Sequence, residues 1–147
     1  MIVRKIRMDD REEYFEMAAD FYSSDAVCHP IPPSHFEKTF TELMRSQEYA
    51  EGYVLEYDGK TVGYALLAKT FSQEAGGMVV WIEELYVKPK YRGRGLGHKF
   101  FEYLKDHLPQ NTKRLRLEAE SDNQKAISLY RRFGFQNFPY YQMFRKI

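Results

Sequence analysis

Cysteine is almost absent from this sequence of 147 residues, because Cys28 is the only one. A single cysteine excludes an internal disulfide, and we therefore expect a reducing, cytoplasmic location. Cys28 could act as a nucleophile, but the sequence identifies no partner residue that would activate it. The four histidines do not have the spacing to other ligand types that a zinc site requires, so we expect no metal.

Long apolar runs and an excess of charge of one sign are missing as well. No stretch approaches the roughly 20 apolar residues of a membrane span, and residues 1–6 lack the apolar core of a signal peptide, so we expect a soluble protein. The formal net charge is +1, which gives no reason to expect nucleic acid or a membrane as a partner. Aromatic residues are plentiful, with 12 Tyr and 11 Phe, and they serve in cores and in ligand pockets. The length fits one domain that spans residues 1–147.

Periodicity along the chain predicts a mixed α/β fold. Strands are predicted at 2–7, 53–57, 62–70, 78–87 and 115–119, with a last pair at 135–138 and 140–144. Helices are predicted near 9–21, 34–44, 95–108 and 123–134. The segment from Met78 to Ala119 is therefore strand, helix, strand, whose two strands should be parallel with a right-handed crossover. Only one such unit is present, whereas a doubly wound dinucleotide-binding fold would repeat it.

A glycine-rich loop follows the strand that ends at Val87. Its residues are Arg92-Gly93-Arg94-Gly95-Leu96-Gly97-His98. Glycines let backbone N–H groups approach an anion, and the first helical turn adds unpaired donors and the positive end of its dipole. The spacing is not that of a Walker A loop, and the third glycine is one residue early for the dinucleotide fingerprint. The two arginines suit a pyrophosphate, although they could instead form a solvated basic turn.

A second segment follows the same parallel unit. It runs from Glu118 to Phe135, with Asn123 at the start of a helix, Tyr130 inside that helix and Gly134 at its end. Together, the two segments resemble the coenzyme A signature and the following strand and helix of the GNAT superfamily, the acyl-CoA-dependent N-acyltransferases. The resemblance covers most of the chain, but before about Tyr49 only the secondary-structure pattern matches.

The resemblance implies a fold and an activity. The fold is a single-domain GNAT-like α/β fold whose mixed, mostly antiparallel twisted sheet has about six to seven strands, with the parallel strand-helix-strand unit in its middle and about four helices. The activity is that of an N-acetyltransferase, which transfers the acetyl group of acetyl-CoA to a primary amine of a small-molecule acceptor by direct attack in a ternary complex. A homodimer is a common assembly in this family, so we expect that two copies can pair.

The resemblance also implies roles for residues. Those expected to bind the carrier are Leu85, Tyr86, Val87, Arg92, Gly93, Arg94, Gly95, Leu96, Gly97, His98, Asn123, Ala126 and Tyr130. The backbone N–H near Leu85 would polarise the thioester carbonyl. Tyr130 matches the general acid that protonates the departing thiolate, although its helical spacing also fits a core aromatic. Asn123 has an amide suited to the carrier's arm, and its alternative role is that of a helix cap alone.

Glu83 matches the position of the base that deprotonates the amine in some polyamine-type members of the family. Other members carry an acid two residues earlier, where this chain has Trp81. Glu84, Glu118 and Glu120 are alternative bases, and Glu83 could instead be an exposed acid paired with a lysine or an arginine. Because Glu83 and Glu84 are adjacent on a strand, they should project to opposite faces.

The acceptor is expected to be cationic, because these carboxylates would attract an ammonium group. Its selectivity should come from two loops, Cys28 to His35 and Ser72 to Gly77. A protein lysine or N-terminal amine as acceptor, a longer acyl chain as donor, and a non-catalytic acyl-CoA sensor remain alternatives at this stage.

Overall fold

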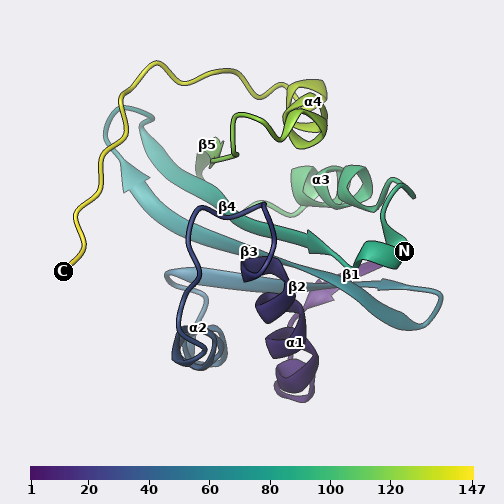
Figure 1. The fold of residues 1–147 in the computed structure, drawn as a ribbon. Helices are drawn as coiled ribbons and strands as arrows, with labels where there is room; N and C mark the ends of the chain where they lie inside the picture. Colours follow the sequence, from purple (N-terminus) through teal and green to yellow (C-terminus); the bar gives the residue numbers. More distant parts are fainter.

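The computed structural model describes residues 1–147 and contains one five-stranded sheet with helices on both of its faces (Figure 1). The strands are β1 (Ile2–Lys5), β2 (Ala50–Tyr57), β3 (Lys60–Ser72), β4 (Gly77–Val87) and β5 (Thr112–Leu117). The helices are α1 (Arg11–Tyr22), α2 (Ser34–Arg45), α3 (Leu96–Asp106) and α4 (Gln124–Arg132), and two single turns of 3₁₀ helix are η1 (Met8–Asp10) and η2 (Pro89–Tyr91).

The strands lie in the order β1-β2-β3-β4-β5, which is also their order along the chain. Neighbouring strands are antiparallel up to β4, whereas β5 pairs with β4 in parallel. The β2–β3 hairpin turns at Asp58 and Gly59, which both have positive φ, as a tight two-residue turn requires. The predicted parallel unit is confirmed, with α3 as the crossover between β4 and β5.

Two hydrophobic clusters lie on opposite faces of the sheet. One cluster joins strand residues such as Val80 and Ile82 to the apolar stripe of α3, which includes Phe100 and Leu104, and α4 packs against it. The other joins α1 and α2 to Tyr64 and to the far end of β4. Each helix therefore buries one stripe against the sheet, as its amphipathic sequence predicts.

The predicted sixth and seventh strands are not formed, so the estimate of six to seven strands was too high. Residues 133–147, in yellow in Figure 1, run from α4 to the C-terminus without joining the sheet. Side-chain contacts hold the first part, since the ring of Phe138 lies against Arg114 and Arg116, and the Tyr140 hydroxyl donates to Glu74. Alternation of apolar residues gives a strand only where a neighbouring backbone supplies hydrogen bonds, and beyond Phe135, whose amide donates to Tyr130, this segment has none.

None of the helices combines the length and the apolar character needed to cross a bilayer.

The sheet tolerates no side chain at Gly63, in the middle of β3. A Cβ atom there would lie 2.2 Å from the carbonyl oxygen of Tyr86 on β4. We expect Gly63→Ala to lower the free energy of unfolding by about 1 to 3 kcal/mol, because β3 and β4 must separate to admit the methyl group. Urea unfolding checks this. Gly59→Asn is the control with little expected change, because asparagine accepts the positive φ of that turn; equal midpoints for all three proteins would contradict the prediction.

Candidate active site

A β-bulge at Glu83 shapes the centre of the candidate site. Ile82 pairs with Leu67 and Glu84 pairs with Leu66, so Glu83 is the extra residue of β4. A bulge reverses the alternation of side chains beyond it. Even-numbered and odd-numbered residues of β4 therefore exchange faces at this point. The face that even-numbered side chains occupy before the bulge is occupied by odd-numbered side chains after it.

The reversal has a direct consequence for the two adjacent glutamates. Glu84 points to the α1 face and is buried, with only 8% of its surface exposed. Its carboxylate accepts hydrogen bonds from the hydroxyls of Tyr22 and Tyr64, each at 2.5 Å. Glu83 instead reaches solvent. Of the two, only Glu83 is free to accept a proton from an incoming molecule.

Strands β4 and β5 separate beyond the bulge. Their pairing ends at Ile82 and Leu117, and β4 continues to Val87 without a partner on that side. The amide of Lys88 donates to β3, so the alternating main-chain groups of Val87 and Leu85 point away from β3. In agreement, the Val87 carbonyl accepts from the Arg92 side chain at 2.8 Å. The N–H of Leu85 thus faces the opening between the strands.

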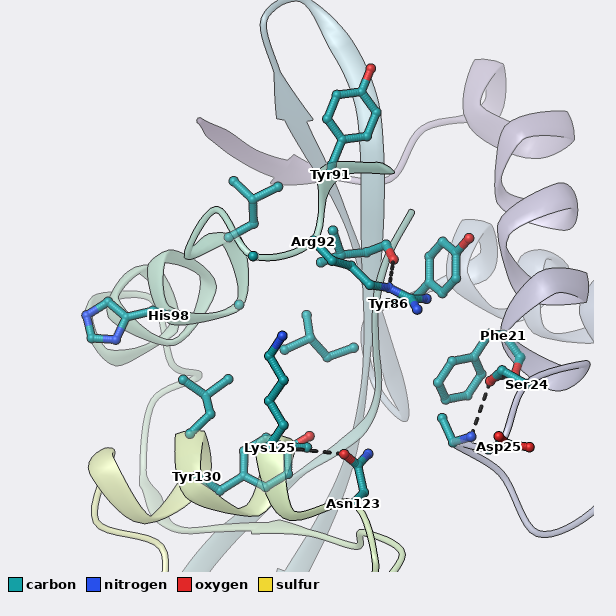
Figure 2. Close-up of a pocket in the computed structure, with 18 of the residues that line it drawn as sticks. Phe21, Ser24, Asp25, Tyr86, Tyr91, Arg92, His98, Asn123, Lys125 and Tyr130 are labelled. Atoms are coloured by element: carbon teal, nitrogen blue, oxygen red, sulfur yellow. Dashed lines mark hydrogen bonds between the residues drawn. The ribbon is translucent and has the colours of Figure 1, made fainter. Parts of the chain in front are cut away.

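A cavity of about 1010 Å³ fills this opening and extends to the starts of α3 and α4. Figure 2 shows Tyr130 and Lys125 of α4 on one side of it, and Phe21 of α1 and Asp25 of the α1–α2 connection on the other. Of the predicted carrier-binding residues, the cavity is lined by Leu85, Tyr86, Val87, Arg92, Gly93, Gly95, Leu96, Gly97, His98, Asn123, Ala126 and Tyr130. Residues 23–26 also line it, and sequence reasoning missed them because they belong to no motif.

The start of α3 offers a row of free donors. None of the six backbone amides from Gly93 to His98 donates to another group of the chain. Gly93 and Gly95 have φ values of 76° and 73°, in the left-handed region that favours glycine. Consecutive free amides at a helix N-terminus form an anion-binding concavity. The left-handed backbone conformation therefore explains why glycine occupies positions 93 and 95.

Gly97 permits the close approach of α4 to α3. A Cβ atom at Gly97 would lie 3.2 Å from the Leu129 side chain of α4 and 3.8 Å from that of Leu85 on β4. A larger residue would push α4, and Tyr130 with it, away from the strand opening.

The two loop arginines carry no carboxylate partner. Arg94 lies 5.7 Å from the ring centres of both Tyr57 and Tyr91, and Arg92 lies 5.8 Å from the ring of Tyr86. Contact with a ring orients a guanidinium without using its hydrogen-bond donors, which here remain free apart from the Arg92 Nε–H that donates to Val87. Arg92 lines the cavity itself, whereas Arg94 does not. Both leave positive charge beside the free amides.

Tyr130 lies half-buried on α4, with its ring between those of Phe101 and Phe135. No group of the chain accepts from its hydroxyl, and no buried side-chain oxygen lacks a partner, so this hydroxyl is open to the cavity. Burial raises the pKa of Tyr130 above its ordinary value. The ring is thus packed as a core aromatic, while the polar end meets the cavity. Asn123 caps α4, since its side-chain oxygen accepts from the Ala126 amide, and its NH₂ group remains available.

The remaining carboxylates differ in their surroundings. Although the Glu83 side chain reaches solvent, the atoms packed around its carboxyl raise its pKa, and the nearby charges of Glu84 and Glu118 act in the same direction. Glu120 accepts a hydrogen bond from Cys28. That bond and the charge of Glu120 raise the pKa of the Cys28 thiol, which disfavours the thiolate that a nucleophile needs. No group of three or more His, Cys, Asp or Glu side chains could hold a metal ion.

Comparisons with known proteins give the family. Residues 10–135 match the model of the acetyltransferase (GNAT) family. The chain is 34% identical to the spermine/spermidine N(1)-acetyltransferase of Bacillus subtilis over 109 residues, which are 70% of this chain and 72% of that protein. It is 35% identical to the thialysine N-epsilon-acetyltransferase of Mus musculus over an alignment that covers 92% of this chain and 84% of that protein.

Solved structures have the same fold at lower identity. A protein described as a possible acetyltransferase from Clostridium difficile 630 has a TM-score of 0.83 at 20% identity, covering 99% of this chain and 97% of that one. AAC(6')-Iy, solved in complex with the bisubstrate analogue CoA-S-monomethyl-acetylneamine, has a TM-score of 0.80 at 14% identity over 99% of this chain and 97% of that one. The fold, the loop at the start of α3 and the family match agree, and the chain belongs to the GNAT family of acetyltransferases and is an acyltransferase enzyme.

Proposed function

We propose that this protein transfers the acetyl group of acetyl-CoA to a primary amine of a small cationic acceptor, by direct attack in a ternary complex. The observation that carries the proposal is the row of six free amides from Gly93 to His98, which opens onto the same cavity as the free hydroxyl of Tyr130. An anion site beside a proton donor is the combination that a phosphorylated thioester carrier needs.

The residues around the cavity fit coenzyme A. The amides at the start of α3 and the guanidinium of Arg92 would hold its pyrophosphate. The unpaired side of β4, from Leu85 to Val87, would pair with the amides of its arm as a neighbouring strand would. The side-chain NH₂ of Asn123 is a further donor for that arm. When bound, acetyl-CoA supplies an acyl group activated as a thioester.

Three groups of the chain would carry out the chemistry. Glu83 accepts a proton from the ammonium form of the acceptor and frees its lone pair. The N–H of Leu85 donates to the acyl carbonyl oxygen, where negative charge develops. Tyr130 gives its proton to the sulfur that leaves. Leu85 and Tyr130 line the cavity, and Glu83 lies two residues before Leu85 on β4, so transfer is expected at the strand opening.

Carboxylates support a cationic acceptor. The side chains of Glu83 and Glu118 are exposed, and their negative charges lie close enough together that Glu118 adds to burial and to Glu84 in raising the pKa of Glu83. The names of two relatives, a spermine/spermidine and a thialysine acetyltransferase, also describe enzymes of small amines. Attraction between an ammonium group and several carboxylates lowers KM more than it changes the chemical step, because it acts before and during the reaction alike.

Thiol release tests the proposal. Purified protein with acetyl-CoA and a panel of diamines, polyamines, amino acids and aminoglycosides should release free thiol, detected with a colour reagent, only when a suitable primary amine is present. Calorimetry with coenzyme A should register binding in the same preparation. Binding without thiol release for any amine would indicate a sensor, and absence of binding would remove the carrier site. Propionyl-CoA and butyryl-CoA in parallel would show whether the donor is acetyl or longer.

A further inference from the structure

A hydrogen bond to a buried carboxylate joins the end of α1 to β4, beside the strand opening. The hydroxyl of Tyr22, the last residue of α1, donates to Glu84 at 2.5 Å. The hydroxyl of Tyr64 on β3 donates to the same carboxylate, also at 2.5 Å. No cationic side chain pairs with Glu84, so these two hydroxyls are the groups that stabilise its buried charge.

The chain from Ser23 to Cys28 starts at this bond and borders the strand opening. Residues 23–26 line the cavity, and Figure 2 shows Asp25 across it from Asn123 of the loop before α4. At the end of the connection, the Cys28 thiol donates to Glu120, which follows β5. The connection therefore reaches from the α1 side of the opening to the β5 side. Most of its side chains are exposed, so hydrogen bonds and not core packing hold it in place.

The last turn of α1 is linked directly to this connection. The Ser24 hydroxyl donates to the Phe21 carbonyl at 2.6 Å and accepts from the Ala26 amide at 3.3 Å. Residues 23–26 therefore follow the orientation of that turn, which Tyr22 holds against the sheet.

A second bond between α1 and β4 is more open to water. The hydroxyl of Tyr86 donates to Asp20 at 2.5 Å, but the Asp20 side chain is exposed, whereas Glu84 is buried. Water competes with a hydrogen bond at an exposed carboxylate and not at a buried one. The bond from Tyr22 to Glu84 is therefore the stronger constraint on the end of α1.

Tyr22 also lies close to the proposed base. Burial, the hydrogen bond to Glu84 and the charges of Glu84 and Glu83 raise the pKa of Tyr22, so its hydroxyl stays protonated and continues to donate. Because the charge of Glu83 acts on Tyr22, the end of α1 borders the part of β4 from which Glu83 reaches solvent. An acceptor that brings its amine to Glu83 would meet residues 23–28 on one side.

We propose that Tyr22 is a positioning residue for the acceptor. By donating to Glu84 it fixes the last turn of α1 and, with it, the connection from Ser23 to Cys28 that borders the opening. The effect on the acceptor rests on the proposed function, whereas the effect on the connection does not. An acceptor that meets a connection already held in place binds with a smaller loss of conformational entropy.

Alkylation of Cys28 reports the position of the connection without turnover, because the chain has no other cysteine. The hydrogen bond to Glu120 and the charge of Glu120 raise the pKa of the thiol and slow its reaction with iodoacetamide. Tyr22→Phe keeps the ring contacts with Phe21 and Phe36 and loses only the hydroxyl. We expect this variant to be alkylated about three- to ten-fold faster at neutral pH. Glu120→Gln is the positive control, because it removes the carboxylate itself.

Tyr64→Phe is the matched control, because it removes the other hydroxyl from the same carboxylate without touching α1's last turn. Both tyrosine variants should lower the melting temperature by about 3 to 8 °C. Only Tyr22→Phe should raise KM for the best amine of the panel, by about five- to fifty-fold, with kcat within about two-fold of the wild-type value. Tyr64→Phe should keep the wild-type KM and the wild-type rate of Cys28 alkylation.

Ser24→Ala is a second variant that decides the matter if Tyr22→Phe does not fold. It cuts the link between the last turn and Ala26 without touching Glu84, so it should speed alkylation of Cys28 with little change in melting temperature.

Other outcomes would overturn the inference. Alkylation of Tyr22→Phe at the wild-type rate would show that the bond does not hold the connection. Equal changes in both tyrosine variants would indicate general loosening around Glu84. Faster alkylation with an unchanged acceptor KM would remove the role in acceptor binding. Absence of thiol release with every amine would defeat the proposed function, and the alkylation rates would still decide whether Tyr22 positions the connection.

Discussion

Tyr130→Phe should lower kcat by about ten- to a thousand-fold while coenzyme A still binds. The substitution removes one oxygen atom that makes no hydrogen bond within the chain, and the ring keeps its packing against Phe101 and Phe135. The thiolate would then have to leave without a proton donor. The deficit should shrink as the pH rises past the ordinary thiol pKa of about 8.5, because above that pH the departing sulfur is stable as a thiolate and gains less from a proton donor. Steady-state rates between pH 6 and about 10 measure this.

Tyr103→Phe is the matched control for Tyr130→Phe. Tyr103 lies on α3, its ring stacks on His107, and it does not line the cavity. Its loss of a hydroxyl should leave kcat near the wild-type value. If the Tyr130 variant turned over as fast as the Tyr103 variant, Tyr130 would have no part in protonating the leaving group. Calorimetry with coenzyme A on both variants separates a chemical defect from a binding defect.

Glu83→Gln should lower kcat/KM by about a hundred- to a thousand-fold, since an amide of nearly the same shape cannot accept a proton from the acceptor. In the wild-type protein, the activity should rise with pH as Glu83 loses its proton. This acid limb should lie above the ordinary range of a glutamate, because desolvation and the charges of Glu84 and Glu118 raise the pKa of Glu83. The limb should be absent from the Glu83→Gln profile of kcat/KM.

Glu118→Gln is the control, and it tests the direction in which the acid limb of the pH profile moves. Removing a neighbouring negative charge favours the ionised form of Glu83, so its pKa should fall and the acid limb should move to lower pH. The maximal rate should change far less than in the Glu83 variant. An acid limb that persists in Glu83→Gln but vanishes in Glu118→Gln would instead assign the base to Glu118.

The bulge decides between the two adjacent glutamates, and no local pattern predicts it. Strand alternation predicts that Glu83 and Glu84 project to opposite faces, but the bulge interrupts that alternation at Glu83 itself, so the rule does not apply across this pair. Which of them is free depends on the register against β3 and on the hydroxyls of Tyr22 and Tyr64, which come from sequence positions 62 and 20 residues away from Glu84. Glu84 is consequently held as a buried acceptor between α1 and β3. Its place among the alternative bases is not supported by this geometry.

In the C-terminal segment, the sequence pattern predicts structure that does not form. The apolar residues at 135–138 and 140–144 alternate well enough to predict two strands, and the structure forms neither. Phe138 instead lies against arginines of β5, and Tyr140 lies at the β3–β4 turn. Period-two patterning reports which side chains could share a face, whereas a strand also needs a backbone partner in register.

The sequence by itself predicted the part of the proposed carrier site that is local. The free amides, the left-handed glycines and the helix start all lie within the seven residues from Arg92 to His98, so their spacing along the chain is enough to indicate an anion-binding loop. Only the tertiary structure decided which residues lie across the strand opening from the start of α3. The bulge at Glu83 and the position of residues 23–26 along the cavity depend on contacts between segments far apart in the chain, which single-sequence periodicity does not encode.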